Sequence, residues 1–454
     1  MSWFHSFKMS WYRVFQEDRD GLAGSRRRLV VGNLFSSLGS SITAGIFYTA
    51  LILVLFRGES ESLRNEYIGN IAMLQTAAGF LQMVAPQILE RLKNRKRYIM
   101  GLRWLYHFLN IFCLGVIPIL PLEIHWKANL FLVVATLMSA SVALYTPGLQ
   151  AWHIYPVSEQ CRSDYFTISS ILGNVMTHSV SLFASVFMDF FAKDAQEYTA
   201  ILIMRGVALL AIAMETKNYW QIKEPEYHVS EKKPSFLEIL SVPFRHPMYL
   251  LNLLIGGLWA SFTATLGSYY SAYLLADAKV SYSLLGIMNI ASIPMTMLGL
   301  PIWNQLIRRF GWYRPMAVSW LLFGAIYGIN GLVTEESKWL YGVGTVLCAF
   351  VMGGYSLGGA NLPYFNAPKE GLSSCLAFYS TFSSIMGFVG AWVGKVFIRE
   401  TEGKIIEVFG LELKNGAYVS FIPFFGSFLV SALILVVYFV DKKKQAMQAQ
   451  TVGA

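Results

Sequence analysis

The sequence predicts an all-α integral membrane protein, with 12 transmembrane helices in two parallel six-helix pseudo-repeats. The composition is the first observation, since 55% of the 454 residues are hydrophobic and only 14% are charged, too apolar for a soluble chain of this length. Apolar runs of about 20 residues, each long enough to cross a bilayer as a helix, are the second. The third is a pair of basic loops at equivalent positions in the two halves.

The apolar runs favour helices over the strands of a membrane barrel, because barrel strands alternate apolar and polar residues. The expected spans are 28–56, 66–89, 98–120, 129–151, 166–190, 198–214, 247–275, 282–304, 315–334, 339–362, 376–398 and 418–440. Residues Gly387, Gly390 and Gly394 form a stripe of small residues that predicts close helix packing in the eleventh span.

Most of the 36 Lys and Arg residues lie in segments that face the cytoplasm if the amino terminus is inside. The positive-inside rule therefore predicts that both termini are cytoplasmic. We expect the protein in the inner (plasma) membrane of a bacterium. The formal net charge of +9 is then a sign of topology, and we expect no nucleic-acid partner.

We expect five regions along the chain. The first region, residues 1–27, has the aromatic and charged residues of an interfacial amphipathic helix, and a disordered tail is the alternative. The regions are a cytoplasmic amino-terminal segment 1–27, a first six-helix bundle 28–214, a cytoplasmic central loop 215–246, a second six-helix bundle 247–440 and a cytoplasmic tail 441–454.

The four cysteines are scattered along the chain and show no metal-ligand spacing. We therefore expect no structural disulfide, no bound metal and no cofactor.

Several spans carry polar residues. His178, four residues after Asn174, is the deepest ionisable group and is either a satisfied interhelical histidine or a functional one. Arg103 is close enough to the inner surface to be an interfacial anchor, with His107 one turn deeper. The acidic residues fall in loops or at span ends and none lies mid-membrane, so a carboxylate proton relay is not expected. Coupling through His178, coupling to another ion, or no coupling stay open.

The two basic loops follow the second and eighth spans, at an offset slightly above 210 residues. The first loop, 90–97, contains an acid as well as bases, and the second is 304–315. Their candidate gating residues are Glu90, Arg91, Arg95, Lys96, Arg308, Arg309 and Gly311. A plain positive-inside anchor is the alternative for the bases of the first loop.

These features resemble the major facilitator superfamily over residues 28–440. That superfamily's loop signature runs Gly, three variable residues, Asp-Arg-x-Gly-Arg-Lys; here Glu90-Arg91 stands for the Asp-Arg and Arg95-Lys96 for the closing basic pair. The second loop keeps a basic residue and Gly311. The resemblance implies charge-pair gates at the inner mouth. The fourth span has no arginine and the fifth no proline, which disfavours drug-proton antiport.

In this superfamily the first, fourth, seventh and tenth spans line a central cavity. The resemblance therefore selects the polar and aromatic residues of these spans, with four more from adjoining spans, as candidate substrate ligands. They are Ser40, Thr43, Phe47, Tyr145, Trp259, Thr263, Tyr270, Tyr355 and Asn361, with Gln75, Asn174, His178 and Asn289 from the adjoining spans. Hydroxyl, amide and aromatic groups suit a neutral polar solute such as a sugar, glycoside or nucleoside.

The leading hypothesis is a monomeric secondary active or facilitative transporter of a small polar organic molecule, working by alternating access in the lipid bilayer. The alternatives are an exporter of amphipathic compounds on the same fold and a solute sensor that does not transport. An enzyme is not expected, because we find no His-Glu-x-x-His, serine elbow or P-loop.

Overall fold

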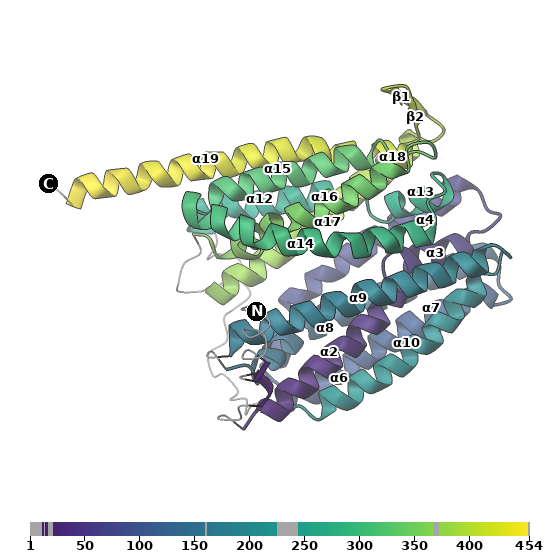
Figure 1. Ribbon diagram of the computed structural model, residues 1–454, viewed down its shortest axis with the longest axis horizontal. Helices are drawn as coiled ribbons and strands as arrows, with labels where there is room; N and C mark the ends of the chain where they lie inside the picture. The colour runs from purple at the N-terminus through teal and green to yellow at the C-terminus, as the bar shows by residue number, and fades with distance from the viewer. Residues whose placement is uncertain are drawn as a thin grey trace. The chain divides into compact units, whose positions relative to one another are not determined.

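The computed structural model describes residues 11–12, 14–16, 21–158, 161–224, 244–366 and 372–452. Within these residues helices dominate, and the only sheet is an antiparallel hairpin of β1 (Ile406–Val408) and β2 (Leu411–Leu413) (Figure 1). Most of the expected amino-terminal amphipathic helix lies outside the described residues. Its described part includes Val14 and Phe15, which pack in a core formed with the first helices.

Contacts divide the chain into two compact units, 1–58 with 84–233 and 59–83 with 234–454. The first unit contains α2 (Ala23–Thr43), α3 (Ile46–Leu55), α5 (Ala85–Leu89), α6 (Arg95–His107), the π-helix η2 (Phe108–Cys113), α7 (Leu114–Val116), η3 (Ile117–Ile119), α8 (Ile124–Ile154), α9 (Arg162–Ala192) and α10 (Glu197–Trp220). Here α2 packs on α9 and α10, and α6 packs on α8.

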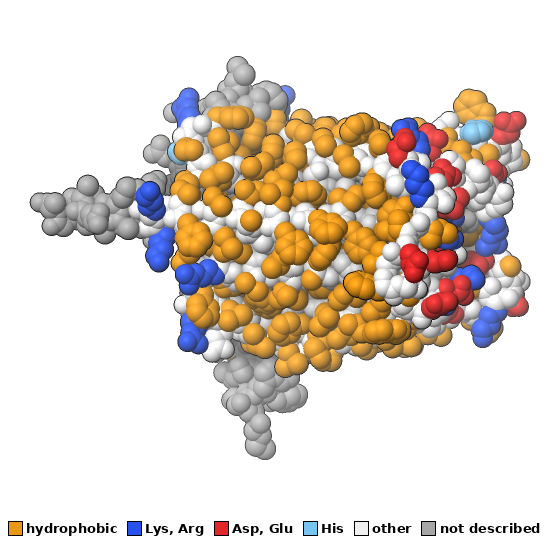
Figure 2. Space-filling model, turned by 90° about the horizontal axis from the view of Figure 1, so that it is seen from above, with side chains coloured by type: hydrophobic (Ala, Val, Ile, Leu, Met, Phe, Trp, Pro, Cys, Tyr) orange, Lys and Arg blue, Asp and Glu red, His pale blue; other side chains and the backbone are white. Residues whose placement is uncertain are grey.

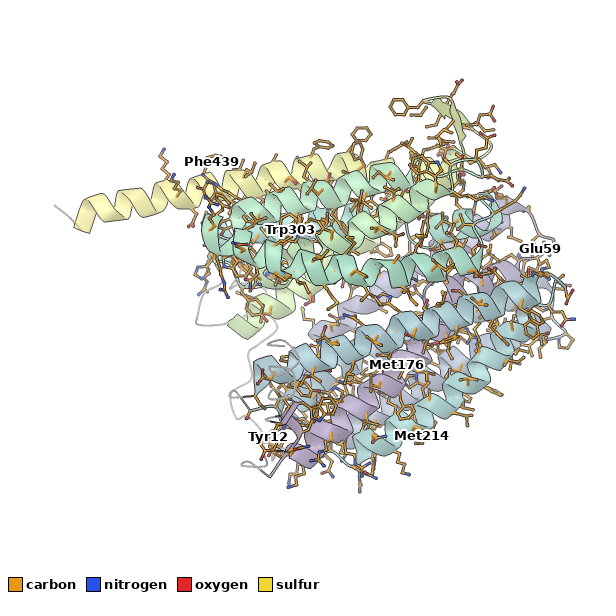
Figure 3. All side chains as sticks on the ribbon, viewed as in Figure 1. Tyr12, Glu59, Met176, Met214, Trp303 and Phe439 are labelled. Carbon is orange, nitrogen blue, oxygen red and sulfur yellow. The ribbon has the colours of Figure 1, made fainter. Side chains whose placement is uncertain are left out.

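The second unit is also helical apart from its hairpin. It contains α4 (Glu61–Ala78), η1 (Gly79–Met83), α12 (Pro247–Ala264), α13 (Tyr269–Ala276), α14 (Tyr282–Phe310), α15 (Tyr313–Asn330), α16 (Trp339–Asn361), η4 (Leu362–Tyr364), α17 (Leu372–Glu400), α18 (Asn415–Tyr418) and α19 (Phe421–Val452). The main contacts are α14 with α16, α15 with α16 and α19, and α12 with α17. Trp303 of α14, labelled in Figure 3, contacts α16, because its Nε1 donates a hydrogen bond to the carbonyl of Phe350 on α16 at 3.0 Å.

The helices have the length and polarity of membrane spans. Among the described residues, ten helical segments are long and apolar enough to cross a bilayer. The more polar α4, continued by η1 and α5, and the helix α15 complete the expected 12. Figure 2 shows apolar side chains over the middle of the helices and most charged side chains toward their ends. The predicted all-α membrane fold is confirmed.

Helix α4 lies in the second unit, although the sequence places it in the first six-helix repeat. It packs along α17, where Gly387 lies beside Thr76 and Gly79 lies beside Ser384. Ser60 caps the start of α4 by accepting a hydrogen bond from the Leu63 amide at 3.2 Å. The small residues explain why α4 groups with the second unit, because they allow α4 and α17 to approach closely.

The glycine stripe on α17 also determines how this helix meets α12. A Cβ atom at Gly390 would overlap the carbonyl oxygen of Ser261, and one at Gly394 would overlap that of Thr265. Since these are backbone atoms of a packed helix, they have little freedom to move away.

We predict that Gly390→Ala lowers the free energy of unfolding by about 1–3 kcal/mol through overpacking. Thermal unfolding in detergent measures the change. Gly206→Ala on α10 is the control, because no atom lies within 4 Å of the added methyl group, and it should be neutral or stabilising by up to about 1 kcal/mol. Equal effects of the two substitutions would contradict the close α12–α17 contact.

Candidate functional site

The first span of the chain is interrupted. Helix α2 ends at Thr43 and α3 begins at Ile46, with Gly45 at φ +58° between them. Thr43 and Phe47 flank this interruption and are both buried. The Thr43 hydroxyl donates to the Gly39 carbonyl at 2.8 Å and accepts from Asn110 Nδ2 at 3.5 Å. An interrupted helix leaves backbone groups within the membrane that can bind a polar ligand.

The seventh span is interrupted in the same way. Helix α12 ends at Ala264 and α13 begins at Tyr269, with Gly267 at φ +45° in the intervening turn. Thr263 and Tyr270 flank this turn, and the buried Tyr270 hydroxyl has no hydrogen-bond partner among the described residues. The two glycines are 267 − 45 = 222 positions apart, close to the offset of the basic loops. Interruptions at matching positions of two repeats are the best indication of a binding site in transporters of this kind.

An aromatic cluster lies next to the second interruption, within the second unit. Trp259 Nε1 donates to the Tyr355 hydroxyl at 2.8 Å. The Tyr355 ring stacks on Phe323 with 4.2 Å between centroids, and Trp320 lies 5.3 Å from Trp259. Thr263 donates to the Trp259 carbonyl at 2.9 Å. Trp259 and Tyr355, two predicted ligands, are therefore held rigidly by their neighbours.

A buried polar cluster lies in the first unit, where α2, α6, α8 and α10 meet. Arg103 Nε donates to a carboxylate oxygen of Glu215 at 2.9 Å, and Nη2 of Arg103 makes a second contact with the same oxygen. Arg103 also donates to Ser36 Oγ at 2.8 Å and to the Tyr145 hydroxyl at 3.3 Å. The guanidinium thus connects the predicted ligand Tyr145 to an ion pair.

The position of Glu215 corrects two expectations. The sixth span was expected to end at 214, which placed Glu215 in the central loop, but α10 continues to Trp220 and buries Glu215 to 1% exposure. Glu215 lies about 27 Å along α10 from Glu197. Arg103 was interpreted as an anchor, but it pairs with Glu215 instead of reaching the surface. The sequence contained a signal that the helix continues past 214. Glu215 and Tyr219 are four residues apart, so on a helix both side chains project from the same face.

Six further predicted ligands lie on α2, α4, α9, α14 and α16. On α9, Asn174 is exposed and His178 half-buried, and neither makes a hydrogen bond to a described residue. Ser40 is exposed and donates to the Ser36 carbonyl at 2.9 Å, and Asn361 donates to the Leu357 carbonyl at 2.8 Å. The other two, Gln75 and Asn289, are half-buried. Their role as ligands stays a prediction.

The basic loop after the second span is partly engaged inside its own unit. Lys96 Nζ donates to the carbonyls of Trp220 and Ile222 at 2.6 and 2.9 Å, which ties the start of α6 to the end of α10. The side chains of Glu90 and Arg91 make no hydrogen bond or ion pair within the part of the chain that the structure describes.

The basic loop after the eighth span shows a different arrangement. Gly311 ends α14 with φ +77°, and Arg308 and Arg309 are exposed. The gating function of both loops stays a prediction.

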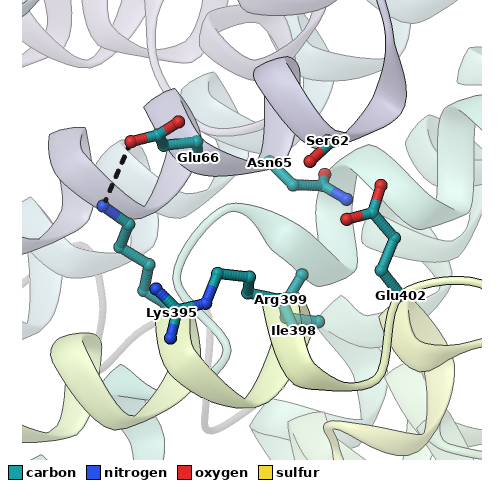
Figure 4. Close-up of a pocket in the computed structure, with 7 residues that line it drawn as sticks. All are labelled: Ser62, Asn65, Glu66, Lys395, Ile398, Arg399 and Glu402. Carbon is teal, nitrogen blue, oxygen red and sulfur yellow. Dashed lines mark ion pairs between the residues drawn. The ribbon is translucent and has the colours of Figure 1, made fainter.

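A pocket of about 180 Å³ lies between α4 and α17 in the second unit (Figure 4). Lys395 Nζ donates to Asn70 Oδ1 at 2.6 Å and lies 3.7 Å from a carboxylate oxygen of Glu66. The pocket is lined by Ser62, Asn65, Glu66, Lys395, Ile398, Arg399 and Glu402. Lys395 falls within the eleventh expected span, 376–398, and its partners come from a helix more than 300 residues earlier in the chain.

A second ion pair stabilises the same end of the second unit. Lys414 Nζ donates to Asp277 Oδ1 at 2.5 Å, which links the segment before α18 to the end of α13. This hydrogen bond raises the pKa of Lys414, so the pair is present throughout the neutral pH range.

Comparison with known proteins places the chain in a family. The model of the MFS_1 like family matches residues 59–409, which is most of the chain. The chain belongs to the MFS_1 like family. This MFS_1 like protein is thus an integral membrane transporter, and not an enzyme. Among curated protein sequences, none matches it.

Solved structures share the fold of this MFS_1 like protein at low sequence identity. A variant of the nucleoside transporter NupG has a TM-score of 0.63 and 12% identity over 91% of this chain and 100% of that chain. A bacterial homologue of the iron transporter ferroportin, in an inward-facing state, has a TM-score of 0.68 and 13% identity, covering 91% and 98%. A D-xylose-proton symporter has a TM-score of 0.65 and 12% identity, covering 90% and 96%.

We predict that Trp259→Ala lowers the free energy of unfolding by about 3–5 kcal/mol, because it removes a buried aromatic side chain. Trp259→Phe keeps one aromatic ring but loses the second ring and the hydrogen bond to Tyr355, and should cost less, about 1–3 kcal/mol. Trp392, which is 52% exposed, is the control, and Trp392→Ala should change stability by no more than about 0.5 kcal/mol. Wild-type stability of Trp259→Ala would contradict the packed cluster.

We predict that Lys395 and Asn70 are energetically coupled. A double-mutant cycle with Lys395→Met and Asn70→Leu should give an interaction energy of about 0.5–1.5 kcal/mol in unfolding experiments. Arg399→Met is the matched control, because Arg399 bonds to Glu400 on its own helix, and its effect should add to that of Asn70→Leu. Strict additivity of the Lys395 pair would show that this contact does not hold α4 on α17.

Proposed function

We propose that this transporter moves a small neutral polar solute, of the sugar, glycoside or nucleoside class, by alternating access. The observation that carries the proposal is the pair of interrupted helices at matching positions of the first and seventh spans. The predicted ligands beside them are Thr43, Phe47, Thr263 and Tyr270. These side chains are uncharged, and they offer hydroxyl groups and aromatic faces.

The buried ion pair of the first unit is compatible with a neutral solute. Arg103 and Glu215 neutralise each other within the helices, so this pair presents no net charge to a substrate. Tyr145 is held by Arg103 and can still accept or donate a hydrogen bond through its hydroxyl. Such an arrangement recognises a polar molecule by hydrogen bonds instead of by charge.

The solved structures with this fold are named as transporters of different substrates: nucleosides, iron and D-xylose. The fold therefore does not select the substrate. Hydroxyl, amide and aromatic groups suit the first and third of these better than a metal ion, whose usual ligands are carboxylate, imidazole or thiolate groups.

The remaining parts of the proposal follow from the sequence. The protein works as a monomer in a bacterial inner membrane, with both termini in the cytoplasm and without a nucleic-acid partner. Glu90, Arg91, Arg95 and Lys96 act with the second basic loop as inner gates. The carboxylate of Glu90, which has no partner among the described residues, is available for one in another conformation.

We predict that a nucleoside or a sugar raises the unfolding temperature of the purified protein. A ligand at 100 times its dissociation constant stabilises the folded state by about 2.7 kcal/mol. The screen uses uridine, adenosine, D-xylose, maltose, amino acids, organic acids and a cationic amphipathic dye. Stabilisation by the dye alone would favour the exporter of amphipathic compounds and contradict the proposal.

Variants locate the bound solute. Thr43→Val should remove most of the ligand-induced shift. Thr136→Val is the control, because Thr136 on α8 makes the same type of bond to its own helix, to the Leu132 carbonyl at 2.8 Å, and is not one of the predicted ligands. A full shift in Thr43→Val would remove this residue from the site.

A further inference from the structure

Two buried polar side chains meet beside the first interrupted span. Asn110 belongs to the π-helix η2 and Arg205 to α10, and they are 4% and 3% exposed. Nη1 of Arg205 donates to the main-chain carbonyls of Asn110 and Ile111, the second at 3.3 Å. Nδ2 of Asn110 donates to Thr43 Oγ1 at 3.5 Å, at the end of α2. Neither Asn110 nor Arg205 is among the ligands that the sequence predicts.

These side chains lie at a similar depth in the first unit. With a rise of about 1.5 Å per residue, Arg205 is about 12 Å from the start of α10, and Thr43 is about 18 Å from the end of α3. Asn110 is about 14 Å from the end of the third span at Ile119. Because successive spans alternate in direction, these three ends lie on one side of the membrane. The three residues therefore lie well inside the apolar part of the unit.

Both side chains have hydrogen-bonding atoms without a partner. These atoms are Nε and Nη2 of Arg205 and Oδ1 of Asn110, and none has a hydrogen-bond partner among the described residues. The Tyr106 hydroxyl interacts with the amide from one turn earlier on the same helix, but Oδ1 makes no hydrogen bond of normal length and angle. Unsatisfied polar atoms are costly to bury, so their presence here requires an explanation.

The charge of Arg205 also has no counter-charge within the part of the chain that the structure describes. The titratable side chains that act on the guanidinium are Tyr48, Tyr106 and Tyr198, and no acid is among them. Arginine keeps its positive charge at any physiological pH. A buried charge inside a membrane span is costly and usually indicates a functional site.

Gly115 on α7 leaves space next to the guanidinium. A Cβ atom at this position would lie 3.1 Å from Cδ and 3.8 Å from Nε of Arg205, and the next nearest atom is Cδ2 of Leu202 at 3.9 Å. The carbonyl of Gly115 accepts from the Tyr198 hydroxyl at 2.7 Å, which holds this part of the third span against α10. The glycine thus leaves room for one oxygen atom beside the unpartnered Nε.

The unpartnered atoms restrict which chemical group they bind. The guanidinium of Arg205 only donates, and Oδ1 of Asn110 only accepts. A carboxylate or phosphate would accept from Arg205 but would be repelled by Oδ1 of Asn110. An ammonium group or a metal ion would bind Oδ1 but would be repelled by the guanidinium. A hydroxyl group both donates and accepts, so a single oxygen satisfies the two residues.

We propose that Asn110 and Arg205 form a hydroxyl-binding subsite for the transported solute. A solute hydroxyl accepts from Arg205 and donates to Oδ1 of Asn110. This inference rests on the proposed transport of a sugar, glycoside or nucleoside, and it adds the residues that select for a hydroxyl group. Arg205 also holds the π-helix through two carbonyls, so one side chain both positions Asn110 and binds the solute. A bound water molecule has the same hydrogen-bonding groups and is the rival occupant.

Asn252 provides a matched control in the second unit. It is fully buried, its Nδ2 donates to the Phe365 carbonyl at 2.6 Å, and its Oδ1 also has no partner among the described residues. It lies about 18 Å along α12 from the interrupted end of that helix. Asn252 therefore shares the burial and the unpartnered oxygen of Asn110, but its amide is tied to a main-chain carbonyl and lies far from the interruption.

The first experiment needs no substrate and compares thermal unfolding of the purified full chain in detergent. Asn110→Leu should unfold at the wild-type temperature or above it, because it removes an unsatisfied oxygen and only one long hydrogen bond. Asn252→Leu should unfold about 2 °C lower or more, because the Phe365 carbonyl loses its donor. A decrease for Asn110→Leu as large as that for Asn252→Leu would show that Asn110 serves helix packing, and would overturn the proposal.

The second experiment measures dissociation constants from ligand-induced unfolding shifts. The probes are uridine and its 2′-, 3′- and 5′-deoxy analogues, and D-glucose with its deoxy analogues. In wild type, the analogue that lacks the bound hydroxyl should bind about tenfold to a hundredfold more weakly than its parent, because both residues are left unpaired. In Asn110→Leu and in Arg205→Met this difference should fall below about twofold, since the partner is already missing. Asn252→Leu should keep the full difference.

A charged probe tests the chemical class of the bound group. D-glucuronate carries a carboxylate where D-glucose has a hydroxymethyl group. We expect D-glucuronate to bind no more tightly than D-glucose in wild type. Tighter binding of D-glucuronate that is lost in Arg205→Met would identify a carboxylate as the occupant and would overturn the assignment to a hydroxyl group.

The remaining outcomes separate the subsite from the transport function. Differences between parent and deoxy analogues that are all unchanged in Asn110→Leu overturn the subsite and leave the proposed function intact, and a bound water molecule gives this result. Absence of binding by every probe in wild type contradicts the proposed substrate class instead. The unfolding comparison of Asn110→Leu with Asn252→Leu then decides on Asn110 alone.

Discussion

Polar groups inside apolar helices need partners from the protein itself, because the hydrocarbon core supplies no water to bind them. This constraint explains most of the specific contacts in both units. Arg103 takes the buried carboxylate of Glu215, Lys395 takes the amide oxygen of Asn70, and Trp259 takes the hydroxyl of Tyr355. Each contact joins different helices, so satisfying a polar group also determines which helices pack together.

The same constraint accounts for the irregular segments. The π-helix η2 presents the carbonyls of Asn110 and Ile111 to the guanidinium of Arg205, whose own helix offers no carboxylate at that level. A π-helix shifts the hydrogen-bonding pattern of the main chain and is often found at functional positions. The interruptions at Gly45 and Gly267 likewise expose backbone groups. Irregular backbone within a membrane span is tolerated where the protein or a ligand binds it.

The architecture was largely predictable, because a membrane span is recognised from the average hydrophobicity of about 20 residues. Apolar runs long enough to cross the bilayer were sufficient to locate most spans, and the two basic loops indicated the repeat. Single boundaries were less certain, since the last turns of α10 are polar and were assigned to a loop. That error of six residues placed Glu215 in a cytoplasmic loop and removed it from consideration as a buried carboxylate.

The candidate site was predictable only in part. Composition and family resemblance were enough to select Thr43, Tyr145, Trp259 and Tyr355, because polar and aromatic residues inside spans are uncommon and expected to have a function. Partners were not predictable, since Arg103 and Glu215 are 112 positions apart and Lys395 and Asn70 are 325 apart. The local sequence therefore determines the membrane helices, because they form wherever a run of residues is hydrophobic enough. The pairing of buried charges is decided by the tertiary structure, because these side chains meet only when the helices pack.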